Sequence, residues 1–143
     1  MCIRDRPPPP RSVLRYWLQG PAAGTTDVLA GPLPGVPDGI SRAPDGGFWV
    51  SLVSPVTPAS RLLGWRTARA LAAWLPAALR PVPGRWGAVL KLGPDGGQRA
   101  LLMDPSGEAV FHLSSAIERG GQLYLGALTG AYVARVPLDG LAL

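Results

Sequence analysis

The sequence predicts an all-β protein built from short antiparallel strands. The 19 glycines and 17 prolines make up a quarter of its 143 residues, a density that suits many tight turns better than long helices. Two Gly-Gly pairs, at 46–47 and 120–121, each precede an aromatic, β-rich run, which is typical of a hairpin that leads into a strand. A hydrophobic content of 47% provides for a core and excludes a disordered chain.

The stretch 33–53 contains the repeating unit of the chain. Its Pro37-Asp38-Gly39 segment predicts a first turn, because proline presets φ and glycine accepts a positive φ. The segment 43–47 predicts a second turn, and a buried strand is expected to follow it. The same order returns about 74 positions later, so 46–53 and 122–128 are predicted to be equivalent strands. This repetition is typical of β-propeller blades arranged around an axis.

The remaining strands follow from β-rich runs between turn residues. Segments 12–18 and 25–30 are expected to form the outer hairpin of a blade whose inner strands lie upstream of them. Further strands are predicted at 86–92, 98–103, 109–113 leading into 114–117, and 131–137. The chain is therefore expected to contain about nine strands.

One segment, at about 58–81, predicts a helical insertion between strands. Residues 60–80 are rich in alanine and leucine, and at ~100° per residue Leu71, Trp74 and Leu75 share one face while arginines gather on the other. Pro76 is expected to kink or end the helix. Three roles remain open: packing on the body of the domain, a lid over a pocket, or contact with a membrane surface.

Charge and residue counts exclude several classes of function. The net charge is +5, because 14 basic residues outnumber 9 acidic ones. The basic residues are scattered along the sequence and form no basic patch, which argues against nucleic-acid binding. One cysteine and one histidine exclude a disulfide framework within the chain and a site with several histidine ligands. No apolar run reaches the ~18 residues of a membrane-spanning helix. Residues 1–10 have no pattern related to the rest and are interpreted as an extraneous or disordered leader.

Five segments in order resemble the C-terminal part of strictosidine synthase-like proteins, in particular the branch of the adipocyte plasma membrane-associated protein and its bacterial relatives. They are 15–21, 33–40, 46–50, 102–107 and 121–128. The resemblance covers residues 11–138 and implies a six-bladed β-propeller. Residues 11–143 would then be a C-terminal fragment with about two and a half antiparallel four-stranded blades, because a closed ring needs more than twice this length.

The same resemblance implies a pocket on the propeller axis that binds a small-molecule substrate and usually a calcium ion. Relatives with this architecture hydrolyse lactones and aryl esters, so the complete protein is expected to be such a hydrolase, and the fragment by itself to be inactive. The alternative is a non-catalytic binding propeller, associated with a membrane through residues 60–80. Without the true N-terminus, a periplasmic and a membrane-associated location both remain open.

Asp38 is the candidate metal ligand that the resemblance implies. It lies where the family has Pro-Asp-Asn-Ile, whose Asp and Asn lie at the central calcium in calcium-binding relatives. Gly39 stands at the Asn position, so one oxygen ligand is lost, and an asparagine there would be expected to restore it. The structural alternative for Asp38 is stabilisation of its own turn.

His112 and Ser114 are the candidate pocket residues. The plant condensing enzyme has a His-x-Glu motif whose glutamate is its acid/base, and the resemblance places His112 on the histidine and Ser114 on the glutamate. A serine cannot act as that base, so strictosidine-type condensation is disfavoured. The alternative for His112 is a partly buried strand histidine with a hydrogen-bond partner.

No nucleophile can be assigned from the sequence. The lone histidine has no evident acidic partner, and no Gly-x-Ser-x-Gly elbow is present. Turn chemistry explains Asp45, Asp95 and Asp104, and Glu118, which precedes a hairpin, is expected to face solvent.

Overall fold

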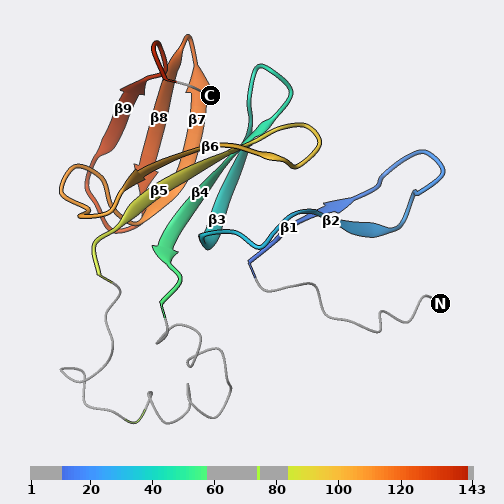
Figure 1. The fold of residues 1–143 in the computed structure, drawn as a ribbon, viewed down its shortest axis with the longest axis horizontal. Coiled ribbons are helices and arrows are strands. Elements are labelled where there is room, and N and C mark those ends of the chain that lie inside the picture. Colours follow the sequence, from blue (N-terminus) through green and yellow to red (C-terminus); the bar gives the residue numbers. More distant parts are fainter. Residues whose placement is uncertain (1–10, 58–73, 75–83, 142–143) are drawn as a thin grey trace.

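A computed structural model describes residues 11–57, 74 and 84–141. Within these ranges nine strands form three antiparallel sheets (Figure 1). The first sheet contains β1 (Val13–Tyr16) and β2 (Thr26–Ala30). The central sheet contains β3 (Gly35–Arg42), β4 (Phe48–Pro55), β5 (Gly87–Leu92) and β6 (Gln98–Asp104). The third sheet contains β7 (Leu113–Arg119), β8 (Gln122–Ala127) and β9 (Val133–Pro137).

Strand order within each sheet follows the sequence, which confirms the predicted all-β class and its short hairpins. Strands β4 and β8 are both the second strand of their sheet, and a Gly-Gly turn precedes each of them. The segments 46–53 and 122–128 are therefore equivalent, as the repeat predicts.

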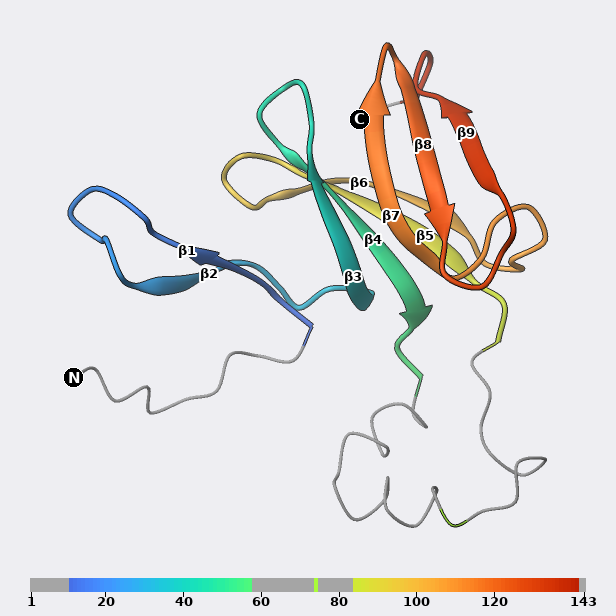
Figure 2. The same cartoon turned by 180° about the vertical axis from the view of Figure 1, so that it is seen from behind.

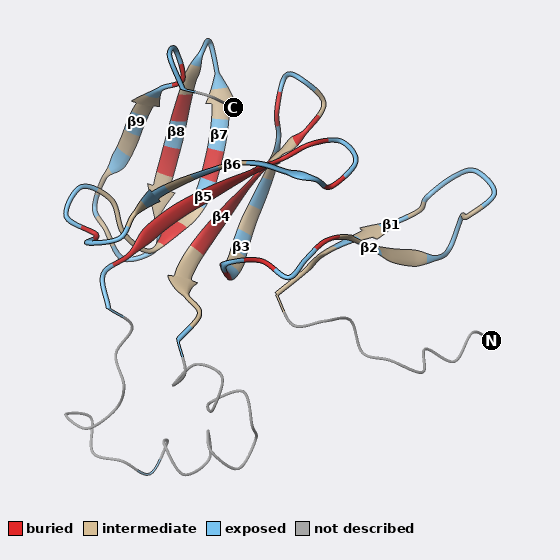
Figure 3. Ribbon diagram, viewed as in Figure 1, coloured by how far each residue is buried: buried red, intermediate tan, exposed pale blue. Residues whose placement is uncertain are grey.

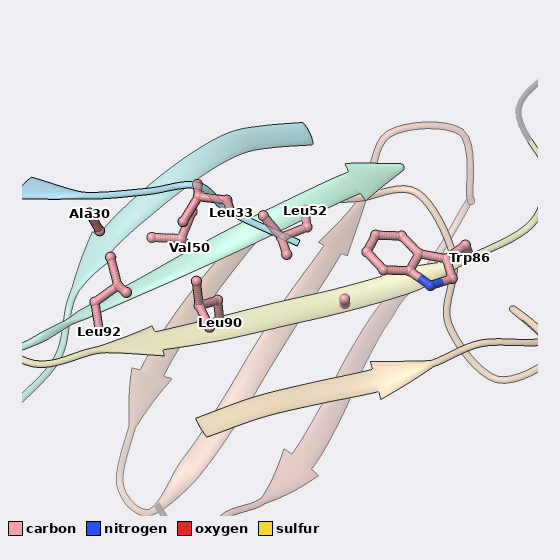
Figure 4. Packing of buried hydrophobic residues seen from close by; sticks show 8 residues of the cluster. Ala30, Leu33, Val50, Leu52, Trp86, Leu90 and Leu92 are labelled. Carbon is pink, nitrogen blue, oxygen red and sulfur yellow. The ribbon is translucent and has the colours of Figure 1, made fainter. Parts of the chain in front are cut away.

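The two inner strands of the central sheet, β4 and β5, are buried, and two apolar clusters cover their two faces (Figure 3). Strands β4 and β5 read as almost continuous apolar runs because each face of them meets another sheet. On the face toward the first sheet, the cluster in Figure 4 joins Leu52 and Leu90 to Leu33, which follows β2. On the opposite face, Trp49 and Val89 pack against Leu123 and other side chains of the third sheet.

The predicted turn at 37–39 is wrong, because these residues lie inside β3. The pairing of β3 with β4 shifts register on both sides of Pro37, before Ile40 is reached. Proline cannot donate a ladder hydrogen bond, and it is tolerated here because β3 is the edge strand of its sheet and is bulged at this point. The strand predicted at 109–113 also starts late, since β7 begins only at Leu113.

Glu118 does not face solvent as predicted, because its side chain is only 16% exposed and lies between the central and third sheets. Its Oε2 accepts a 2.6 Å hydrogen bond from Trp49 Nε1 and lies 3.3 Å from Lys91 Nζ. The Lys91 side chain is 5% exposed, and its ammonium also lies 3.1 Å from Asp45 Oδ2. A buried ammonium needs such partners, so the cluster offsets the desolvation of Lys91.

The helical insertion predicted at about 58–81 lies outside the described residues, except for Trp74, which is 89% exposed. The predicted leader at 1–10 also lies outside them. Among the residues that the structure describes, none belongs to a helix long and apolar enough to cross a membrane.

We expect Gly96→Ala to destabilise the protein more than Gly46→Ala. Both glycines have φ near +85° in equivalent Asp-Gly-Gly turns, so each substitution carries the ~1–2 kcal/mol strain of a left-handed alanine. Only at Gly96 would a Cβ overlap the carbonyl oxygen of Leu29, whereas the nearest atom at Gly46 is 3.8 Å away. Overpacking adds roughly 1–3 kcal/mol. Urea unfolding measures both variants, and equal losses would contradict this packing of β2 on the turn after β5.

Candidate functional site

The sequence-predicted site residues lie toward one end of the sheets. Gly35 pairs with Pro55 at the start of β3, and Leu113 pairs with Ala127 at the start of β7. At this same end β4 finishes and β5 begins (Figure 2). At the opposite end lie three hairpin turns between consecutive strands. These turns contain Asp45, Asp95 and Gly120.

Strands β3 and β7 run side by side in the same direction, although they belong to different sheets. Ser41 Oγ donates a hydrogen bond to the Ala116 carbonyl, and the Cα of Gly39 lies against the Ser114 carbonyl. The structure therefore brings the backbone segments of Asp38 and Ser114 together. Side chains alternate along a strand, so Asp38 is exposed and directed away from β7.

Position 39 has no room for the asparagine that the family pattern contains. A Cβ at Gly39 would overlap the carbonyl oxygen of Ser114, and the Gly39 N–H already bonds Ser51 Oγ at 2.9 Å. The expectation that an asparagine here restores a calcium ligand is therefore wrong for this backbone. Any side chain at this position would push β3 away from β7.

The described residues do not make a calcium site by themselves. Calcium takes six to eight oxygen ligands, and Asp38 supplies one carboxylate. No group of three or more His, Cys, Asp or Glu side chains in the described ranges has the spacing of a metal site. In this part of the chain, Asp38 therefore supplies only one of the ligands that the ion implied by the family resemblance needs.

His112 lies in the loop just before β7 and is held at both its backbone and its ring. Its N–H donates to the Trp86 carbonyl at 2.8 Å, and its own carbonyl accepts from Leu128 N–H at 2.8 Å. Its φ of 48° is a left-handed conformation that a histidine seldom adopts, so the surrounding contacts hold it there. The expected hydrogen-bond partners are present, but His112 is a loop residue and not a strand residue.

The ring nitrogens of His112 have two different partners, and these define its tautomer. Nε2 lies 3.3 Å from the Gly84 carbonyl, which can only accept, so Nε2 carries the proton. Nδ1 lies 2.9 Å from Thr129 Oγ1, and in the tautomer that is protonated only at Nε2 it accepts the threonine hydroxyl hydrogen. In that tautomer the basic nitrogen of the ring faces a hydroxyl group.

Tyr132 contacts both the loop that contains His112 and the loop that contains Thr129. Its hydroxyl accepts the Phe111 N–H at 3.0 Å, and its ring meets the Phe111 ring edge-on at 5.8 Å. A Cβ at Gly130 would overlap the Tyr132 ring, so only glycine fits beside Thr129. Thr129 and Tyr132 were not predicted as site residues. The available signal was the position of Thr129, just after a strand that ends beside the start of β7.

Asp104 organises the turn that leads to His112. Its carboxylate accepts hydrogen bonds from the N–H groups of four later residues, which are Ser106, Gly107, Ala109 and Val110. The Val110 N–H, the hydroxyl of Ser106 and the other N–H groups together lower the pKa of Asp104 to about 2. This confirms Asp104 as a turn residue and explains why 109–112 is not a strand.

The fold defines a class of protein. Consecutive antiparallel meanders that pack face on face, with the first strand of one beside the first strand of the next, form part of a β-propeller.

No family model matches the chain, but curated relatives do. It is 31% identical over 134 residues to adipocyte plasma membrane-associated protein of Bos taurus, covering 88% of this chain and 32% of the relative. It is 36% identical over 127 residues to protein STRICTOSIDINE SYNTHASE-LIKE 1 of Arabidopsis thaliana, covering 84% and 32%. The chain belongs to this strictosidine synthase-like family and spans about a third of the length of these relatives.

We expect Asp104→Asn to lower stability at neutral pH but not in strong acid. A pKa lowered in the folded state stabilises the protein above the unfolded value of ~3.9, and this contribution disappears as pH falls toward 2. Urea unfolding at several pH values should therefore show a gap between wild type and variant that closes from pH ~4 to ~2. The control is Glu108→Gln, an exposed carboxylate in the same loop. A gap that stays constant in acid would contradict the role of the charge.

Proposed function

We propose that the complete protein hydrolyses a small lactone or aryl ester and that His112 is its general base. The observation that carries this proposal is the position of the His112 ring, whose Nε2 lies 3.3 Å from the Gly84 carbonyl and whose Nδ1 lies 2.9 Å from the Thr129 hydroxyl oxygen. General bases of ester hydrolysis need this arrangement, in which one nitrogen is oriented and the other receives a proton. Membership of a family whose fold also carries lactonases and aryl esterases supports the same activity.

The alternative chemistry of the family has less support here. Strictosidine-type condensation needs the carboxylate of a His-x-Glu motif, and Ser114 stands at the glutamate position. The Ser114 hydroxyl donates to the Gly126 carbonyl at 3.3 Å, so it is bonded to the neighbouring strand β8 and offers no base.

We propose calcium only as a ligand of the complete protein, with Asp38 as one of its oxygen donors. Asp38 is exposed near the start of an innermost strand, where a cation on the propeller axis could reach it together with oxygens from outside the described residues. Such an ion would polarise the substrate carbonyl.

A binding propeller that contacts a membrane is the second candidate. The observation in its favour is Trp74, the one described residue of the segment 60–80, which is 89% exposed. Tryptophan is a common anchor at membrane interfaces. Absence of ester turnover together with vesicle binding that depends on Trp74 would favour this candidate.

Replacing His112 tests the proposed activity. We expect His112→Asn to lower kcat for p-nitrophenyl acetate at least about 100-fold, because general-base catalysis contributes about 10²–10⁴. Asparagine tolerates a positive φ, so the loop conformation is kept while the base is lost. The assay uses the protein at its full natural length, with thermal unfolding to check that the variant folds. Unchanged turnover in the folded variant would remove His112 from the mechanism.

Asp38 is tested through calcium-dependent stability. If Asp38 is a ligand, Asp38→Ala should abolish the rise in melting temperature that calcium causes, and Asp38→Asn should reduce it, since the amide keeps one oxygen donor. Calorimetry of the full-length protein with calcium and with chelator measures this effect. Equal melting temperatures with and without calcium in the wild type, or equal losses in both conditions for the variants, would exclude the calcium role.

A further inference from the structure

We propose that the Oγ1 of Thr129 is the nucleophile of this protein and that it forms an acyl-threonine intermediate. This inference rests on the proposed hydrolase function and identifies the group that attacks the ester. Thr129 follows β8 at the end of the third sheet where β7 begins, and it is exposed, so a substrate can reach it. Its hydroxyl lies 2.9 Å from His112 Nδ1, within the range at which a base takes a proton.

The direction of proton transfer follows from the second nitrogen of the ring. In the tautomer protonated at Nε2, which donates to the Gly84 carbonyl, Nδ1 has a free lone pair that accepts the Thr129 O–H. The nucleophile, the base and the orienting group are therefore linked by hydrogen bonds. They are the Thr129 hydroxyl, the His112 ring and the Gly84 carbonyl, in this order. This is the logic of a serine hydrolase triad, with a backbone carbonyl in the place of the acidic residue.

The two side chains are pre-organised by contacts that do not involve their reacting atoms. The Leu128 N–H donates to the His112 carbonyl, so the residue before Thr129 is bonded to the histidine backbone. Tyr132 holds Phe111 through its hydroxyl, and its ring packs on Gly130. The loops on both sides of the pair are thus fixed to each other, which a catalytic pair requires and an exposed surface contact does not.

Two other hydroxyls near this end of the sheets form hydrogen bonds with backbone groups. Ser114 Oγ donates to the Gly126 carbonyl at 3.3 Å, and Tyr132 Oη accepts from the Phe111 N–H at 3.0 Å. Among the described residues, Thr129 is the hydroxyl whose hydrogen bond to His112 the structure shows. The geometry therefore selects Thr129 over Ser114, which the family alignment had made the pocket candidate.

The reaction balances with water as the only co-reactant. Thr129 Oγ1 bonds to the ester carbonyl carbon while its proton moves to His112 Nδ1, which gives a tetrahedral intermediate. The bond from this carbon to the leaving oxygen then breaks, and His112 returns the proton to that oxygen. Water attacks the acyl-threonine with His112 again as base, and the carbon–Oγ1 bond breaks to release the acid and restore the hydroxyl.

The test combines two substitutions with a chemical trap in the full-length protein. Thr129→Val keeps the shape of the side chain but removes the nucleophile, and Thr129→Ser keeps a hydroxyl. With p-nitrophenyl acetate we expect T129V to lose at least about 100-fold in kcat and T129S to stay within about 10-fold of wild type. Acid quenching followed by peptide mass spectrometry should find an acetyl group on residue 129 in the wild type and in T129S, and none there in T129V.

Matched controls separate this inference from the proposed function. Thr25→Val changes an exposed threonine whose hydroxyl donates to the Ala22 carbonyl in the β1–β2 loop, and it should leave turnover unchanged. If the wild type hydrolyses the ester and T129V, folded by its melting curve, retains more than a third of that rate, then Thr129 is not the nucleophile and His112 activates water instead. If T129V does not fold, acetyl transfer in T129S decides. A wild type that neither hydrolyses nor becomes acetylated overturns both proposals.

Discussion

The close approach of β3 and β7 is the constraint on which the rest of the structure depends. The Gly39 backbone lies against the Ser114 carbonyl, and the Ser41 hydroxyl donates to the Ala116 carbonyl, so the innermost strands of two sheets nearly touch. Only glycine permits this spacing, because a Cβ would separate the strands. The apolar cluster around Trp49 and Leu123 can close only if the two sheets stay this close.

Charged side chains hold the same interface, between the central and third sheets, at its other end. Lys91 is buried beneath Glu118 and Asp45, and its ammonium lies 4.7 Å from the Trp49 ring, where a cation is attracted to the aromatic face. Such a cluster adds little net stability compared with an apolar core, but removing one partner leaves a buried charge without compensation. The cluster therefore favours one packing position of the third sheet on the central sheet. In this position β7 and the loop of His112 lie at the start of β5.

The site combines family positions with a residue outside the family pattern. His112 was predicted because the family resemblance places it on the histidine of a His-x-Glu motif, and the structure shows its ring bonded between Gly84 and Thr129. Thr129 was not predicted, because an isolated threonine after a strand has no distinctive sequence signal. The partners of His112 come from segments 17 and 28 residues away, and only the packed sheets bring them together. Asp38, in contrast, belongs to the same end but points away from β7.

Local chemistry in the sequence was sufficient to determine the strands other than β3, the Asp-Gly-Gly hairpins and the equivalence of β4 with β8, because turns and β-rich runs depend on neighbouring residues. Tertiary packing decided three other features. Pro37-Asp38-Gly39 became a bulged strand because β3 is an edge strand that must lie against β7, and Glu118 became buried because Lys91 and Trp49 meet it there. The pairing of His112 with Thr129 was decided in the same way, since backbone hydrogen bonds between distant loops set the distance between their side chains.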